Sequence, residues 1–137
     1  MRIWTLTLVA ALAATSVRAE TFVCEFNKRH VLQGNDFAAL KIENQEKPAS
    51  FAFSAPDDSC GKRTEYKNLT GNWSGMVHVN CGAGRTTFTE WSTSDNLFIV
   101  TVYRGKVGGK YPAVYTLHAW IPGVDFFRPQ IATGFCK

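Results

Sequence analysis

Two histidines and one glutamate are the residues of this 137-residue chain whose types could together support acid–base chemistry or metal binding. His78 and His118 each stand in a segment of alternating polarity, on the side opposite the mainly aliphatic residues. Convergence of both with Glu90 would create a metal or acid–base site. No ligand spacing connects the three, and histidines on unrelated strands are commonly surface groups. The pattern therefore predicts no catalytic residue, no metal and no cofactor.

Other chemically capable residues are better explained as turns. The run Asp57-Asp58-Ser59 offers oxygen ligands, but a calcium cage needs more of them at defined spacing, and such a run is typical of a turn. No Gly-x-Ser-x-Gly motif occurs, and no serine or cysteine has a recognisable partner base. We therefore expect a non-enzymatic protein.

A basic, glycine-rich loop is the first candidate for binding. The segment from Gly105 to Lys110 lies between two strongly apolar segments and lacks the spacing of a phosphate-binding loop. Its lysines either keep a flexible hairpin tip soluble or contact a partner, because recognition residues often lie on loops held by a rigid sheet. The second interpretation predicts Arg104, Lys106 and Lys110 as partner-binding residues.

Aromatic residues suggest an alternative site. In a closed barrel, Trp73, Trp91, Tyr115 and Trp120 could line the mouth and hold one small apolar ligand. Aromatic rings can also stack on bases in a barrel of the oligonucleotide-binding kind, but they fill the core of a small β domain equally well. The alternative prediction is thus a small-ligand carrier.

The four cysteines, Cys24, Cys60, Cys81 and Cys136, predict disulfides. An even number in a small exported domain is typical of a disulfide framework, and no Cys-x-x-Cys metal motif occurs. Four cysteines allow three pairings. We prefer Cys60 with Cys81 and Cys24 with Cys136, because a sheet that closes brings its first and last strands together.

The candidate residues and the cysteines lie on or between short apolar segments that turn residues separate. No segment sustains a helical period, and the length allows one domain. The spacing predicts an all-β fold, a small antiparallel β-barrel or sandwich of about eight strands, lipocalin-like in plan and stapled by two disulfides. Both faces of the segment from Leu97 to Arg104 are apolar, which predicts a strand covered on both sides. The expected strands cover 21–26, 37–42, 50–53, 63–66, 75–81, 86–91, 97–104, 113–120 and 130–135.

The N-terminal segment is predicted to be a signal peptide. Residues 1–19 combine Arg2, a short apolar stretch and small residues before Ala19, so we expect cleavage between Ala19 and Glu20. The mature domain would be 20–137, a monomer without a membrane anchor in the periplasm or secreted. Loss of Arg2 and Arg18 lowers the formal net charge from +4 to +2, which weakens the case for a nucleic-acid partner.

Two resemblances accompany this pattern. Thr87-Phe88-Thr89-Glu90-Trp91, then Tyr111-Pro112-Ala113-Val114-Tyr115, Pro129-Gln130 and Thr133-Gly134-Phe135-Cys136 resemble small uncharacterised exported proteins of alphaproteobacteria that end in a Gly-x-Cys pattern. The resemblance covers roughly the last fifty residues and implies exported, disulfide-bonded β structure. The plan of the chain is also similar to the periplasmic C-type lysozyme inhibitors. Their Ser-Gly-x-x-Tyr loop motif is missing, because Met76-Val77 follow Ser74-Gly75.

Together these observations predict an exported, non-enzymatic binding or inhibitory protein whose partner is unknown. The alternative is the carrier of a small apolar ligand. Neither interpretation includes a nucleic-acid partner, because export removes the protein from most nucleic acid.

Overall fold

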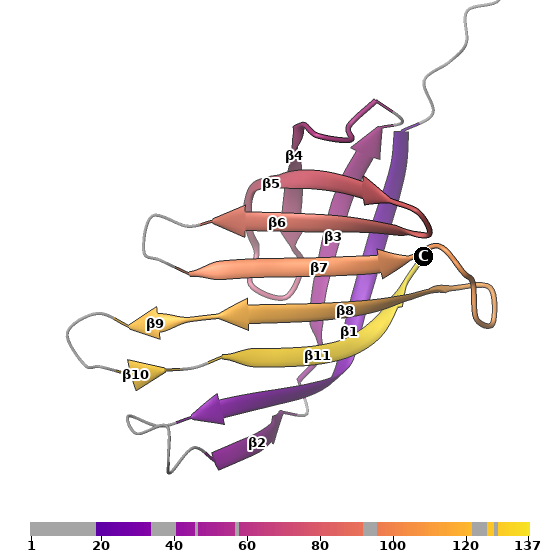
Figure 1. Ribbon diagram of the computed structural model, residues 1–137. Coiled ribbons are helices and arrows are strands. Elements are labelled where there is room, and N and C mark those ends of the chain that lie inside the picture. Colours follow the sequence, from indigo (N-terminus) through magenta and orange to yellow (C-terminus); the bar gives the residue numbers. More distant parts are fainter. Residues whose placement is uncertain are drawn as a thin grey trace, which may run out of the picture.

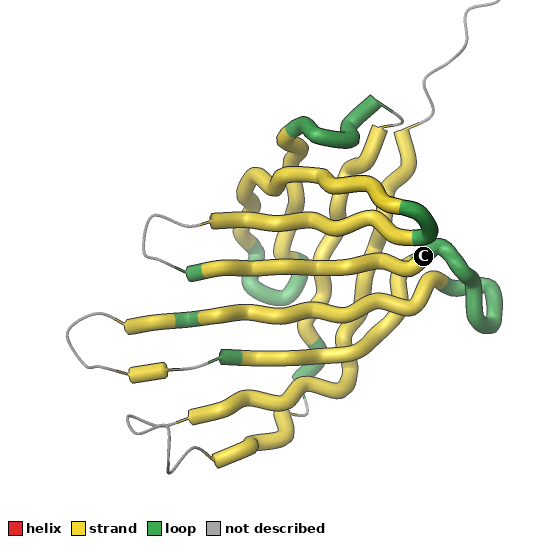
Figure 2. Tube along the Cα trace, viewed as in Figure 1, coloured by secondary structure: helices red, strands yellow, loops and turns green. Residues whose placement is uncertain are grey.

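The fold is built from β-strands (Figures 1 and 2). The computed structural model describes residues 19–33, 41–45, 47–56, 58–91, 96–121, 126–127 and 129–137, and these residues include no helix. None of them therefore forms a helix that could span a membrane. The strands are β1 (Ala19–Gln33), β2 (Lys41–Gln45), β3 (Ala49–Pro56), β4 (Arg63–Asn68), β5 (Trp73–Gly82), β6 (Arg85–Trp91), β7 (Leu97–Tyr103), β8 (Tyr111–His118), β9 (Trp120–Ile121), β10 (Phe126–Phe127) and β11 (Gln130–Cys136).

Eight antiparallel strands close into a barrel. From β3 to β8 each strand pairs with the next along the chain, and β11 follows β8. The barrel closes because β11 pairs with β1, with Cys24 opposite Cys136. Strand β2 pairs with the last part of β1, and β9 and β10 form a separate two-stranded sheet. The predicted all-β barrel is confirmed.

Strand β1 is much longer than the sequence pattern predicts. Phe22, Cys24 and Phe26 are buried at alternate positions, but the pairing with β11 shifts register between Glu25 and Lys28. This irregularity changes which alternate residues face inward, so the alternation of buried residues breaks between Phe26 and Val31. The strand in fact continues to Gln33 and pairs with β3, β11 and β2 along its length.

Aromatic rings fill the middle of the barrel. The rings of Phe53 and Phe88 stack with centroids 4.4 Å apart, and those of Phe51 and Phe98 meet edge-on at 5.1 Å. Such ring contacts add to the free energy gained by burying their apolar surface. The largest fully buried side chains include Tyr66, Phe22, Phe26, Phe53, Phe88, Val31, Val77, Val79, Val100 and Val102.

Strand β7 is fully buried on one face only, contrary to the expectation from its two apolar faces. Phe98, Val100 and Val102 point into the barrel and are buried. The outer face includes the half-buried Ile99 and the exposed Tyr103. The second apolar face of this strand therefore belongs to the outer wall of the barrel.

Both predicted disulfides are present. Cys24–Cys136 joins β1 to β11 across 112 positions of sequence, and Cys60–Cys81 joins the β3–β4 loop to β5 across 21. The first bond therefore fastens the closing seam of the barrel. Two disulfides are compatible with an oxidising compartment outside the cytoplasm.

Candidate functional site

The barrel wall separates the two histidines from Glu90. His78 on β5 and His118 on β8 are both exposed, and each alternates with inward-facing residues of its strand. Glu90 on β6 has the same inward parity as Thr86 and Phe88, which are buried. The structure therefore does not bring the three together. In the part of the chain that it describes, no three His, Cys, Asp or Glu residues could hold a metal ion.

Glu90 is instead the partner of a buried tyrosine. The Tyr66 hydroxyl donates a hydrogen bond to Glu90 Oε2. Burial and this carboxylate together hold the pKa of Tyr66 far above its ordinary value, so the hydroxyl stays protonated and remains a donor. Gly75 makes the arrangement possible, because a Cβ there would lie 2.7 Å from Glu90 Oε1 and 2.8 Å from the Tyr66 ring.

The basic loop between β7 and β8 forms a tight hairpin turn. Val107 and Lys110 form an isolated bridge with backbone hydrogen bonds in both directions. Gly108 and Gly109 occupy the two turn positions with φ of 58° and 78°, a conformation that glycine adopts without steric cost. The turn therefore has a regular backbone, from which the exposed side chains of Lys106 and Lys110 project.

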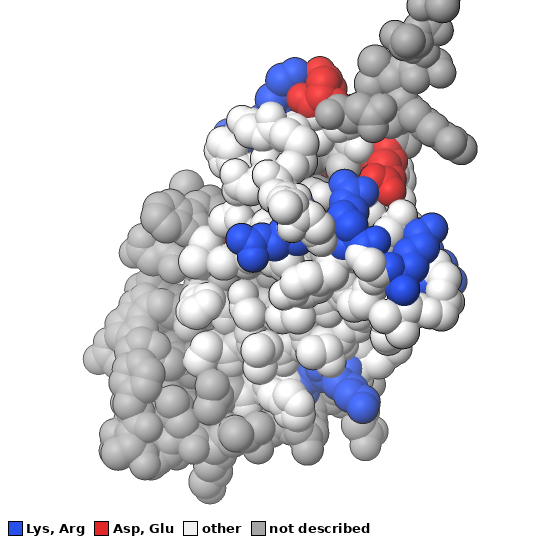
Figure 3. Space-filling model, turned by 45° about the vertical axis from the view of Figure 1, so that its right-hand side comes forward, with Lys and Arg blue, Asp and Glu red and all other residues white. Residues whose placement is uncertain are grey.

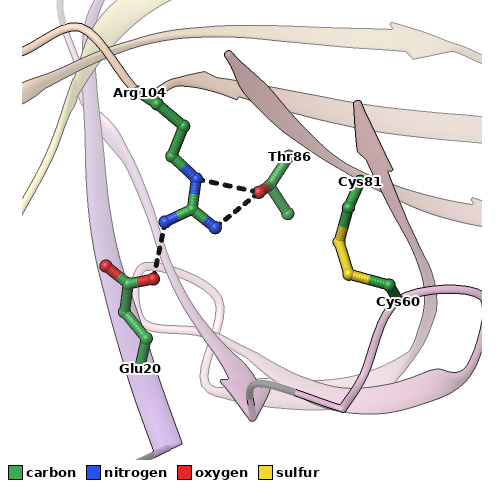
Figure 4. Close-up of a disulfide and its surroundings, with 5 residues drawn as sticks. All are labelled: Glu20, Cys60, Cys81, Thr86 and Arg104. Carbon is green, nitrogen blue, oxygen red and sulfur yellow. Dashed lines mark hydrogen bonds and ion pairs between the residues drawn. A yellow bond between two sulfur atoms is a disulfide. The ribbon is translucent and has the colours of Figure 1, made fainter. Parts of the chain in front are cut away.

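Arg104 closes one end of the barrel (Figure 4). Its Nη1 lies 2.6 Å from Glu20 Oε2, and its Nη2 donates to the buried Thr86 hydroxyl at 2.8 Å. The guanidinium also lies over the Phe22 ring, 5.1 Å from its centroid. Lys106 lies over the ring of Tyr111 in the same way, at 4.8 Å. Two of the three predicted loop residues thus have structural partners.

Lysine and arginine side chains gather on the face from which this hairpin projects (Figure 3). Lys106 and Lys110 are exposed there, as is Arg85 on β6. Glu20 lies at the same end, paired with Arg104. The hairpin end of the barrel is therefore mainly basic.

An open groove of about 370 Å3 lies on the outer wall, beside the irregularity in β1. Gly134 is required at this point, because a Cβ would lie 1.9 Å from the Glu25 carbonyl oxygen. The apolar part of the groove includes the exposed rings of Tyr103 and Phe135. Its full lining is Asn27, Lys28, Tyr103, Pro112, Ala113, Val114, Thr133, Gly134 and Phe135.

The sequence interpretation missed this groove. Tyr103 and Phe135 both alternate with buried neighbours, Val102 and Cys136, so their outward direction could have been inferred from parity. What parity does not show is that β7, β8 and β11 are neighbours in the barrel, and this pairing brings the rings onto one wall.

The predicted aromatic mouth is described in part. Trp73 lies at the start of β5 and is half-exposed, whereas Tyr115 is buried inside the barrel. Ring contacts connect the two through Tyr66 and Phe98. The side chains of the other two predicted residues, Trp91 and Trp120, lie outside the described residues.

Polar groups also face the interior near Tyr115. Arg29 and Tyr115 lie opposite Ala132 on either side of β11, and Gln130 is the preceding inward residue of that strand. Burial raises the pKa of Tyr115 to about 12, although the charge of Arg29 opposes this effect. Gln130 Oε1 is buried and accepts no hydrogen bond from any described residue.

The described part of the acidic segment predicted as a turn, Asp58 and Ser59, has the backbone hydrogen bond of a turn. The Ser59 amide donates to the Pro56 carbonyl at 2.8 Å, and Asp58 forms an exposed ion pair with Lys62. The hydrogen bond from Lys62 lowers the pKa of Asp58. Asp57 lies outside the described residues.

Comparisons with known proteins identify no relative. No protein-family model, no curated protein and no solved structure matches this chain significantly. The resemblances to exported alphaproteobacterial proteins and to lysozyme inhibitors therefore stay predictions.

Proposed function

We propose that this is an exported, non-enzymatic protein that binds a protein partner through the outer wall formed by β7, β8 and β11. The groove on this wall is the observation that carries the proposal. Tyrosine is enriched among the residues that dominate protein–protein affinity, and exposed apolar patches mark interaction sites. Tyr103 and Phe135 form such an exposed aromatic patch in the groove.

The basic hairpin extends this surface. It connects β7 to β8, the two strands that contribute Tyr103, Pro112 and Val114 to the groove. Exposed charges at the edge of an interface mainly increase the association rate with a partner of opposite charge. Lys106 and Lys110 therefore favour an acidic partner, whereas Arg104 serves mainly to close the barrel.

The disulfides and the N-terminal sequence support export to the periplasm or beyond. Residues 1–18 lie outside the described residues, and the barrel begins at Ala19. We expect the intact mass of the exported protein to correspond to a chain that starts at Glu20. Retention of the leader in the exported protein would contradict this assignment.

Site-specific photo-crosslinking in the producing cell tests the binding surface. A benzophenone amino acid replaces Tyr103, and the matched control replaces Met76 on β5. The two side chains are 43% and 42% exposed but lie on different strands of the outer wall. We expect a discrete adduct, identified by mass spectrometry, from position 103 alone. Equal crosslinking yields from positions 103 and 76 would show that the groove is not the specific binding surface.

Charge reversal then tests the hairpin with the partner so identified. Lys106→Glu together with Lys110→Glu should lower the association rate at low salt, with a smaller effect at high salt. Unchanged association under both conditions would exclude the hairpin from the interface.

A small-ligand carrier is the second candidate. The observation that favours it is Gln130 Oε1, a buried acceptor without a donor among the described residues, because such groups normally have a partner. A largely apolar ligand with one hydrogen-bond donor would satisfy it. Native mass spectrometry of the exported protein tests this candidate. A bound molecule that is lost in Gln130→Leu supports it, and a ligand-free wild type contradicts it.

A further inference from the structure

Trp73 presents an aromatic surface at the tip of the β4–β5 hairpin. Its side chain is 49% exposed, yet its ring packs edge-on against the buried Tyr66, with centroids 5.5 Å apart. Its Nε1 lies so close to Gly71 that a Cβ there would be 2.5 Å away. One side of the indole is thus held by the protein, and a substantial part remains open to solvent.

Trp73 is one of the residues that line a depression of about 310 Å3. The groups around it are chemically mixed: amides, a hydroxyl, an ammonium group and one leucine. This mixture differs from the groove of the outer wall, where apolar residues dominate. The lining residues are Lys67, Asn68, Leu69, Asn72, Trp73 and Ser74.

The hairpin that carries these groups is held in place by its own hydrogen bonds. Asn68 Oδ1 accepts from the amides of Thr70 and Gly71, so the remaining hydrogen-bonding group of this side chain is its NH2 donor. Thr70 Oγ1 accepts from the Ser50 amide, which ties the tip to β3. Asn72 has φ of 53°, a conformation that asparagine tolerates better than most residues. The depression therefore requires little ordering when a ligand binds.

We propose that this depression binds a sugar ring. The C–H groups on one face of a pyranose carry partial positive charge and match the electron-rich face of an indole. Its hydroxyls can accept from the Asn68 amide and the Lys67 ammonium and exchange hydrogen bonds with Asn72 and Ser74. The ammonium adds a preference for acidic sugars. This site shares no lining residue with the outer groove. The sugar proposal is therefore independent of the proposal that the groove binds a protein partner.

The same residues could instead belong to a protein interface, because tryptophan is common in such interfaces. Two observations favour a sugar. The volume of the depression suits one or two sugar rings, and most of its lining residues are polar rather than apolar.

Titration of the full chain with glucose, N-acetylglucosamine and glucuronic acid, each as the free sugar, tests the proposal. The readout is the Trp73 indole N–H resonance in a 1H–15N spectrum, assigned by its disappearance in Trp73→Phe. We expect this resonance to shift, with a Kd on the order of 1 mM for a ligand of about twelve heavy atoms. Glucuronic acid should bind more tightly than glucose, and Lys67→Met should remove this difference.

Two variants separate binding from folding. Trp73→Ala, followed through the backbone amide resonances of Asn72 and Ser74, should weaken sugar binding at least about tenfold. Asn72→Gly removes the amide while the backbone keeps its positive φ without strain, and it should weaken binding by roughly threefold to tenfold. Phe135→Ala is the control, because Phe135 is similarly exposed at 44% but lies in the other groove. It should leave sugar affinity unchanged.

Three outcomes would overturn the proposal. The Trp73 resonance could fail to respond to all three sugars. Sugar affinity could survive Trp73→Ala in a protein whose spectrum is otherwise that of the folded wild type. The resonance could also respond only to the crosslinked protein partner, in which case Trp73 belongs to the protein interface.

Discussion

Tyr115 shows how burial of one hydroxyl makes stability depend on pH. Its pKa is about 12 in the folded barrel, against 10.0 for a free tyrosine. Between these values the unfolded chain loses the proton and the folded chain keeps it, so stability falls as the pH rises. The contribution is fully present below pH 10.

We therefore expect the free energy of unfolding to lose roughly 2–3 kcal/mol from this residue between pH 10 and pH 12. In Tyr115→Phe this part of the loss should disappear, whereas the difference between variant and wild type should stay constant below pH 9. Urea denaturation at several pH values measures both. Parallel stability curves up to pH 12 would show that the hydroxyl ionises equally easily in both states.

The ion pairs of Arg104 and Lys62 should contribute differently to the free energy of unfolding. Arg104 also donates to the buried Thr86 and covers Phe22, whereas the exposed Lys62 ammonium pairs with the exposed Asp58 at 2.7 Å. Arg104→Met should therefore lower the free energy of unfolding by about 1–2 kcal/mol. Lys62→Met, the matched control, should cause no measurable change. If urea denaturation gave the same change in the free energy of unfolding for both variants, the contacts of Arg104 with Thr86 and Phe22 would contribute nothing to stability.

The residue types in the sequence singled out the basic residues of the β7–β8 loop, but they did not predict the contacts of these residues. The sequence identified Arg104 and Lys106 as notable because they are charged and flank glycines. It could not show that both lie over inward-facing rings, because those rings come from β1 and from the start of β8. Whether a lysine or arginine side chain is free to bind a partner protein thus depends on contacts with strands that are distant in the sequence.

At the scale of elements, the irregularity in β1 should depend on one glycine. A Cβ on Gly134 would meet the backbone of β1 at Glu25, which cannot move without disturbing the seam of the barrel. Gly134→Ala should destabilise the protein by about 3 kcal/mol. Gly105→Ala is the control, because no heavy atom lies within 4 Å of its added Cβ. Similar unfolding midpoints for the two variants would contradict this explanation.

Most strands follow from the alternation of apolar and polar residues. Val77 and Val79 point inward as their spacing predicts, and β6, β7 and β8 lie close to their expected positions. The prediction was wrong where alternation breaks: β1 was expected to end at Phe26 but continues to Gln33. Periodicity within one strand carries no information on a register shift, which is a property of the pair.

At the scale of the whole molecule, the two disulfides should contribute unequally. Cys24–Cys136 encloses a separation of 112 positions and Cys60–Cys81 one of 21. In the chain-entropy model the first restricts the unfolded chain by about 5 kcal/mol and the second by about 3 kcal/mol. Thermal unfolding of the two double alanine variants should therefore show the larger loss for Cys24→Ala with Cys136→Ala. The reverse order would show that effects in the folded state outweigh loop length.

The seam between β1 and β11 also determines when this protein can finish folding. A chain that emerges from a ribosome or an export channel presents Cys24 first and Cys136 only 112 positions later. Until then Cys24 can meet only Cys60 and Cys81, and a bond to either must be exchanged before the native pair can form. The barrel cannot close before β11 has emerged to pair with β1, so its aromatic interior becomes fully enclosed only after that.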